Sequence, residues 1–173
     1  TSDVLLAYDQ YEVRKIIKIC RGLIDFLDFA RIVQTLEELA TFINNLTPGM
    51  TRMSAQVDER ANDLVHAPHR ERLKMRLDDI KRYTPQLASS MKLAVNSTLP
   101  TQMLAKEEAI KQRDVVVGKI VEALLDIIRT LQMTHLIANG LEPVDIMELK
   151  RIRENMLKKL EDRKSTRLNS SHT

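Results

Sequence analysis

TSDVLLAYDQYEVRKIIKICRGLIDFL, residues 1–27, is a long and uninterrupted helical pattern at the start of the chain. Apolar residues recur in it at steps of three and four, which places them along one stripe of an α-helix. The stripe consists of Val13, Ile16 or Ile17, Cys20, Leu23 or Ile24, and Leu27. A stripe of this length needs partner helices to cover it. The segment therefore predicts a scaffold of packed helices without a catalytic cleft.

The composition of the 173 residues agrees with a helical protein. Hydrophobic residues make up 43% and charged residues 29%, whereas aromatics make up 3%, with four glycines and five prolines. Strands favour β-branched and aromatic residues and need frequent turns, so helices are favoured here. The net charge of +3 is too small to argue for nucleic acid as a partner. No apolar run approaches the ~20 residues of a membrane span, so we expect no transmembrane segment.

The rest of the chain reads as four more helices separated by short breaks. The second is predicted to begin near Asp28, to continue through Pro48 and Gly49, and to turn at residues 66–69. The third is predicted to begin at Pro68 and the fourth to span about residues 102–138, with a loop at residues 96–101 between them. The expected core positions of these helices are Ile32, Leu36, Leu39, Ile43, Leu46, Met50, Met53, Val57, Leu64, Leu73, Leu77, Ile80, Leu87, Met91, Val95, Ile110, Val117, Val121, Leu124, Ile128 and Leu131.

These patterns predict an all-α fold: an elongated up-down four-helix bundle over residues 1–138 with one additional C-terminal helix. Pro48 and Pro85 fall level with each other if their helices form a hairpin, so we expect matched kinks. After the stop at Asn139 and Gly140, residues 141–163 are predicted to form an isolated helix that opens a following module. Residues 164–173 are rich in Ser, Thr and Asn, and we expect them to be disordered and foreign to the natural protein. Because the chain begins at Thr1 without Met, we expect a fragment.

Residues that could carry chemistry are sparse, and we predict no catalytic, cofactor-binding or metal-binding residue. Cys20 lies on the apolar stripe, so we interpret it as a small buried hydrophobe. The pair His66 and His69 has a spacing that suits a metal but lacks a third ligand nearby. The acidic and basic run at residues 58–60 points in different directions on a helix and indicates a solvated face. No glycine-rich phosphate loop is present.

Two basic segments raise the question of other ligands. Arg70, Arg72, Lys74 and Arg76 alternate at every second residue, which predicts scattered charges and no phosphate-binding stripe. The segment around Lys150 to Arg163 is a basic amphipathic helix that could contact acidic lipid. We favour the alternative that its apolar side packs on further helices.

Several stretches of this sequence resemble the vinculin family, and they occur in the same order as in that family. Residues 1–27 are similar to the long helix shared by two bundles in the family's head, above all in the Glu12–Ile17 core. LTPGMTRM at residues 46–53 with DER at residues 58–60 resembles the kinked helix after it. SSMKLAV at residues 89–95 resembles the next helix, and EEAIKQRD and IIRTLQMT at residues 107–114 and 127–134 resemble the fourth. Together they cover about residues 1–134.

The resemblance implies a non-enzymatic cytoplasmic adaptor that links adhesion complexes to actin filaments at adhesion sites and cell junctions. For the full-length protein it implies talin, α-actinin, α-catenin and F-actin as partners, with the talin-capturing bundle and the actin-binding tail outside this chain. No cofactor is implied, and no ligand-binding residue carries over to this chain. An α-catenin-like adaptor of cadherin junctions, or another helical interaction module, is the alternative, although α-catenins match these stretches less well.

Overall fold

The computed structural model describes residues 2–138 and 151–161, and it describes side chains for residues 10–134 and 151–161. Within these ranges the chain forms α-helices, short 3-10 turns and no strand, which confirms the predicted all-α fold. The chain divides into two compact units, Thr1–Thr134 and His135–Thr173. Each unit is described by itself below.

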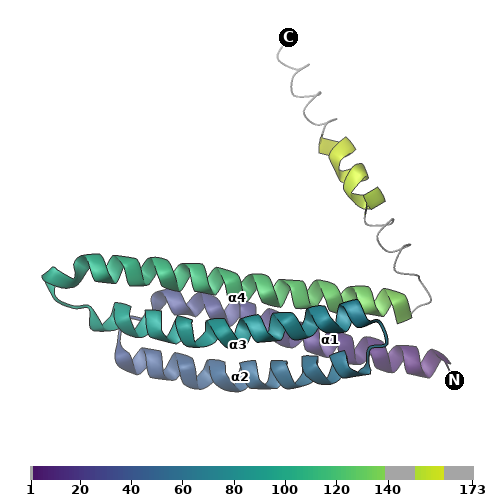
Figure 1. The fold of residues 1–173 in the computed structure, drawn as a ribbon, viewed down its shortest axis with the longest axis horizontal. Helices are drawn as coiled ribbons and strands as arrows, with labels where there is room; N and C mark the ends of the chain where they lie inside the picture. The colour runs from purple at the N-terminus through teal and green to yellow at the C-terminus, as the bar shows by residue number, and fades with distance from the viewer. Residues whose placement is uncertain (1, 139–150, 162–173) are drawn as a thin grey trace, which may run out of the picture. The chain divides into compact units, whose positions relative to one another are not determined.

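The first unit is built on four long helices that run up and down in chain order (Figure 1). Short connections join them: a 3-10 turn, an extended stretch at residues 64–66, and a second 3-10 turn. Each link therefore reverses the chain and sets consecutive helices antiparallel, as a four-helix bundle requires. The elements are α1 (Ser2–Leu27), η1 (Asp28–Ile32), α2 (Leu36–Asp63), α3 (Ala67–Asn96), η2 (Pro100–Gln102) and α4 (Met103–Ala138).

All four helices contribute to a single hydrophobic core. Each large apolar side chain that leaves water stabilises the fold by roughly 1.5–3 kcal/mol, so this core is the main source of stability. The sequence stripes predicted most of its members, including Ile17, Ile80 and Leu124. The largest fully buried side chains are Ile16, Leu27, Leu46, Met53, Leu73, Ile80, Leu87, Met91, Ile120, Leu124, Ile127 and Leu131.

The predicted start of the second helix near Asp28 is wrong. Residues Asp28–Ile32 form a 3-10 turn, and α2 begins only at Leu36 behind the N-cap Thr35. The Thr35 hydroxyl accepts a hydrogen bond from the Glu38 N–H at 3.1 Å, which fixes the helix start at this point. Ile32 and Leu36 are consequently 66% and 53% exposed, so their predicted place in the core is also wrong.

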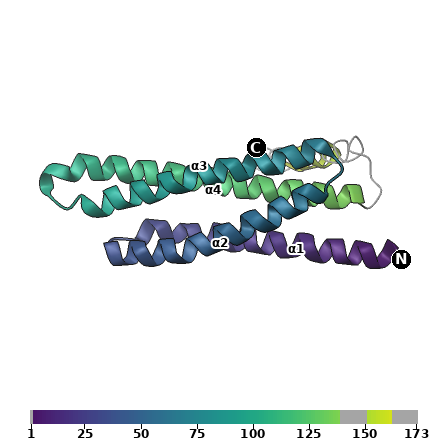
Figure 2. The same cartoon turned by 60° about the horizontal axis from the view of Figure 1, so that its bottom comes forward.

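The two interior prolines are accommodated without a loop. Pro48 lies inside α2 and Pro85 lies inside α3. Figure 2 shows α2 changing direction along its length, as an interior proline that removes a backbone hydrogen bond would cause. A matched bend in α3 stays a prediction.

The glycine after the first proline marks a close approach between helices. A Cβ placed on Gly49 of α2 would lie 2.9 Å from Cδ2 of Leu23 on α1. Leu23 is itself buried, so this helix contact is tight because Gly49 has no side chain.

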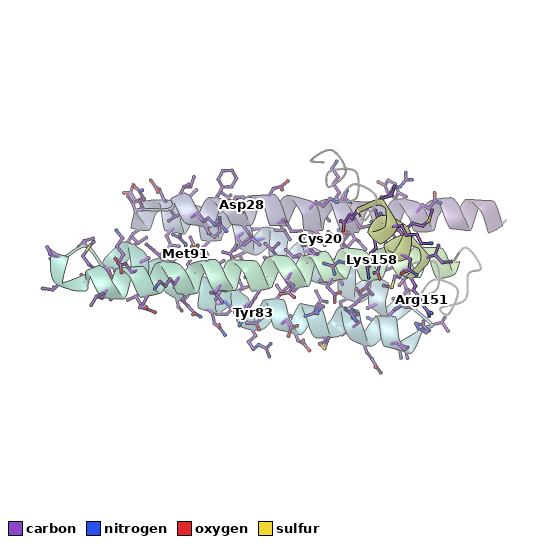
Figure 3. The ribbon with its side chains drawn as sticks, turned by 90° about the horizontal axis from the view of Figure 1, so that it is seen from above. Cys20, Asp28, Tyr83, Met91, Arg151 and Lys158 are labelled. Carbon is purple, nitrogen blue, oxygen red and sulfur yellow. The ribbon has the colours of Figure 1, made fainter. Side chains whose placement is uncertain are left out.

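In the second unit, residues 151–161 are helical and all of them are exposed. Arg151 and Lys158 on this helix are labelled in Figure 3. The predicted helix stop at Asn139 and Gly140, the two ends of the helix predicted over residues 141–163, and the tail 164–173 lie outside the described residues.

Candidate functional site

Cys20, the single cysteine, is completely buried on the core side of α1 (Figure 3). Burial raises the pKa of its thiol to about 12, because the charged thiolate is disfavoured away from water. A thiol in this state is a poor nucleophile. Cys20 therefore behaves as a small core residue, as predicted.

The histidine pair lies at the turn between α2 and α3. The rings of His66 and His69 meet edge to face, with centroids 4.5 Å apart. Burial lowers the pKa of His69, and the neighbouring His66 and Arg72 lower it further. Among the described residues, no group of three or more His, Cys, Asp or Glu side chains has the geometry to hold a metal ion.

A buried carboxylate connects α3 to α4. Asp126 of α4 is 5% exposed, and two arginines of α3 donate hydrogen bonds to it. The Arg72 Nε and Nη2 donate to its two carboxylate oxygens at 2.8 Å each, and the Arg76 Nε donates at 2.7 Å. We call Asp126, Arg72 and Arg76 the Asp126 clamp.

Arg72 and Arg76 keep the Asp126 side chain in its charged carboxylate form. Burial by itself would raise the pKa of Asp126, but the hydrogen bonds and positive charges of Arg72 and Arg76 outweigh it, so the pKa lies below its usual value. The network continues outward, since Arg76 also donates to Asp79 at 3.2 Å and Arg82 donates to Asp79 at 2.9 Å. Two-point contacts of this kind fix the relative position of two helices more specifically than apolar contacts do.

Sequence reasoning missed the Asp126 clamp although two signals were available. Arg72 and Arg76 are four residues apart and therefore share a helix face. The prediction that the charges of this basic run are scattered is therefore wrong for these two residues. Asp126 interrupts the apolar run from Leu124 to Ile128 in the middle of the core stripe of α4. A lone charge at such a position is rarely buried without a partner.

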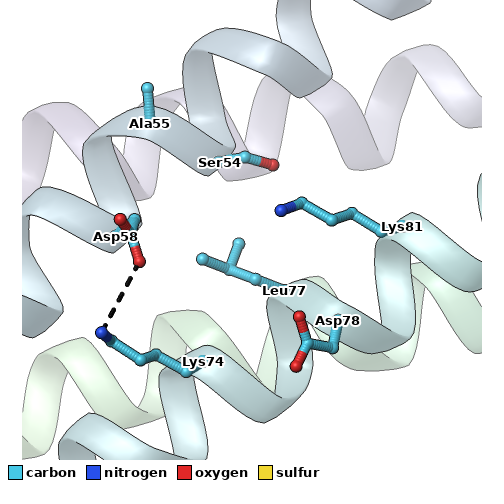
Figure 4. A pocket seen from close by; sticks show the side chains of 7 residues that line it. All are labelled: Ser54, Ala55, Asp58, Lys74, Leu77, Asp78 and Lys81. Carbon is cyan, nitrogen blue, oxygen red and sulfur yellow. Dashed lines mark ion pairs between the residues drawn. The ribbon is translucent and has the colours of Figure 1, made fainter.

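A polar groove lies between α2 and α3, with a volume of about 320 Å³ (Figure 4). Ser54, Ala55 and Asp58 of α2 line one side. Leu77 of α3 lies beside three charged side chains, Lys74, Asp78 and Lys81. The Lys74 Nζ lies 4.0 Å from an Asp58 carboxylate oxygen, which is an exposed ion pair of small energetic value. The charged residue predicted to be solvated, Asp58, is accordingly at the surface.

A second groove, of about 420 Å³, lies at the corner formed by α1, η1 and α2. Phe26 and Phe42 stack in it with ring centroids 5.1 Å apart and an interplanar angle of 7°. The ring centroid of Phe29 lies 5.8 Å from that of Phe26, and Phe29 is 53% exposed. We call this the corner groove; it is lined by Phe26, Phe29, Ile32, Val33, Glu37, Glu38, Thr41, Phe42 and Asn45.

None of these features assembles the nucleophile, base and oxyanion donors of an enzyme. What they do assemble is a bundle of four helices with one apolar core and an ionic connection between α3 and α4. Within the described residues, no helix is long and apolar enough to cross a membrane.

A sequence model of the vinculin family matches residues 1–170. The chain belongs to the vinculin family. It is 43% identical to vinculin of Rattus norvegicus and 42% identical to vinculin of Homo sapiens, each over 134 residues, or 78% of this chain. It is 32% identical to vinculin of Drosophila melanogaster over 161 residues, or 93% of this chain. These matches confirm the family resemblance on which the sequence interpretation depends.

The fold agrees with a solved relative as well. A structure of a vinculin homolog in a sponge (phylum Porifera) superposes with a TM-score of 0.71 at 36% identity, covering 75% of this chain and 16% of that chain. This vinculin-family chain spans only 12% of the rat and human proteins.

Proposed function

We propose that this chain is a non-enzymatic bracing module of a vinculin-like adhesion adaptor, which in its full-length form links cell-adhesion complexes to actin filaments on the cytoplasmic side of the membrane. Membership of the vinculin family supports the adaptor role. The observation that carries the bracing role is the burial of the α1 stripe in the same core as α2, α3 and α4.

The mechanism follows from how α1 is held. Val13, Cys20 and Leu27 follow one another along this helix and are all buried. The helix α1 therefore contacts the core at least from residue 13 to residue 27. A helix held in this way moves only when many apolar contacts break together, because protein interiors pack as densely as crystals. Strain that reaches α1 from a preceding module would therefore pass into the whole bundle.

The proposal is tested by transplanting residues 1–134 into full-length rat vinculin in place of the 134 residues that they match, and expressing the chimera in cells that lack vinculin. We expect the chimera to collect at adhesion sites and to restore traction on the substrate. The same chimera with Ile17→Asp should fail, whereas Lys18→Asp on the exposed face should succeed. A folded chimera that never restores traction would contradict the proposal.

The isolated chain gives a second test. We propose that it lacks the surfaces that bind talin, α-actinin, α-catenin and F-actin in the full-length protein. Co-sedimentation with F-actin and titration with talin helices should therefore detect no strong binding. A dissociation constant in the micromolar range or below for F-actin would show that the bundle itself holds the actin site, and the bracing role would have to be abandoned.

A further inference from the structure

The corner groove is an apolar depression on an exposed surface. Phe29 and Ile32, which line it, are 53% and 66% exposed, and Leu36 at the start of α2 is 53% exposed. Large apolar side chains that cluster at the surface mark interaction sites more often than single ones do. The stacked rings of Phe26 and Phe42 give the groove a rigid inner wall. A partner that buries this surface would gain hydrophobic free energy at little ordering cost.

The charge around the corner groove is negative although the whole chain is positive. Between Arg21 and Arg52 the sequence has four acidic residues and one basic residue. The basic residue is Arg31, and its Nε lies 3.9 Å from Oδ1 of Asp114 on α4, so its charge is paired there. The acidic residues are Asp25, Asp28, Glu37 and Glu38, and the last two line the groove. Against a net charge of +3 for the chain, this corner is a local site for positive charge.

From this combination we propose that the corner groove binds an amphipathic helix of a partner protein, with an apolar face and basic residues on its flanks. A volume of about 420 Å³ accommodates a few large apolar side chains, which one helix face presents at positions i, i+3, i+4 and i+7. Lysines or arginines beside that face meet Glu37 and Glu38, which sets the orientation of the helix. An anionic membrane is disfavoured as occupant because the same carboxylates repel it. The inference depends on the groove alone, so its failure would leave the adaptor proposal intact.

The test uses the full chain and a fluorescent synthetic helix of about sixteen residues, based on alanine, with leucines at i, i+3, i+4 and i+7 and lysines on both flanks. Fluorescence anisotropy should give a dissociation constant on the order of 10–100 µM, a value typical of a weak transient contact. A matched peptide with glutamates in place of the lysines should bind at least about tenfold more weakly.

Two variants test whether the peptide binds in the corner groove. Phe29→Ala removes an apolar wall and Glu37→Lys reverses the rim charge, and each should weaken binding of the lysine peptide by about tenfold or more. Leu104→Ala and Glu107→Lys change exposed residues of α4 outside the groove and should leave binding unchanged. Because Phe29 and Glu37 are both exposed, the melting temperatures of these variants should stay within a few degrees of the parent chain.

Four results would overturn the proposal. The first is no binding of the lysine peptide up to about 100 µM, and the second is equal binding of the glutamate peptide. The third is self-association of the parent chain in sedimentation that Phe29→Ala abolishes, since a second copy would then be the occupant. The fourth is binding to anionic vesicles that Phe29→Ala abolishes, since the groove would then serve a membrane.

Discussion

The α1–α2 and α3–α4 pairs show two ways of holding antiparallel helices together. Between α1 and α2 the described contacts are apolar and close, with Gly49 bringing α2 onto Leu23 and Phe26 stacking on Phe42. Between α3 and α4 the same core continues, but the Asp126 clamp adds an ionic connection. Apolar contacts respond to shape and volume, whereas the clamp responds to charge and pH. The two pairs should therefore fail under different perturbations.

The largest effect is expected from a charge in the apolar core on the α1 side. Ile17→Asp places an unpaired carboxylate among buried side chains, which costs several kcal/mol and approaches the whole stability of a domain. We expect the cooperative thermal transition followed by circular dichroism to disappear. Lys18→Asp, on the exposed side of the same helix, is the control and should melt as the parent chain does. An unchanged melt of Ile17→Asp would mean that the assigned core face of α1 is wrong.

A smaller loss is expected when the α3–α4 connection is broken. Asp126→Asn keeps the shape of the side chain but removes the charge that Arg72 and Arg76 contact. Since Arg72 is half exposed and can return to water, the loss should be about 1–3 kcal/mol and below that of a fully buried pair. Urea unfolding measures it, and Asp78→Asn, an exposed residue of α3, serves as the control. A loss equal to that of the control would show that the clamp contributes nothing.

The clamp should also give the α3–α4 pair a specific pH response. The pKa of Asp126 is lower in the folded chain than in the unfolded one, so its stabilisation is fully present above the unfolded pKa of about 4. It is lost as the pH falls through the still lower folded pKa. The difference in unfolding free energy between the parent chain and Asp126→Asn should therefore shrink as the pH falls below about 4. A difference that does not shrink on acidification below this pH would contradict the charged clamp.

The smallest effects are expected from three glycines, and they should differ in sign. Ala in place of Gly gains up to about 1 kcal/mol of helix propensity. At Gly22 and Gly118 an added Cβ meets no other atom within 4 Å, so both variants should be stabilised by about that amount. At Gly49 the Cβ would press on Leu23, and overpacking should outweigh the gain and leave a net loss of about 1 kcal/mol. Melting temperatures of the three variants decide this; a stabilised Gly49→Ala would refute the tight α1–α2 contact.

The sequence predicted the fold through its periodicity, and it failed where local chemistry competes with periodicity. Ile32 and Leu36 are four residues apart, so they continue a helical pattern across a place where the chain turns. The sequence does carry the signal that stops the pattern, because Thr35 followed three residues later by Glu38 fits the sequence pattern of a capping box. In the structure the Thr35 hydroxyl accepts from the Glu38 N–H, and the Glu38 carboxylate accepts from the Gln34 N–H. The N-cap at Thr35, and not the apolar spacing, therefore determines that the helix begins at Leu36.

The candidate sites were harder to predict because they depend on pairing between distant residues. The Asp126 clamp joins residues 54 and 50 positions apart, and no spacing rule connects them before the helix register is known. The corner groove likewise arises because η1 turns Phe29 and Ile32 outward.

Hydrogen exchange of the backbone amides tests most directly whether α1 is an integral part of the bundle core. If it is, residues 13–27 of α1 exchange only when the whole bundle unfolds, and their opening free energies match those of residues 116–131 in α4 to within about 1 kcal/mol. If α1 exchanges at rates near those of a free peptide while α4 stays protected, α1 is peripheral and the chain cannot brace a neighbouring module through it.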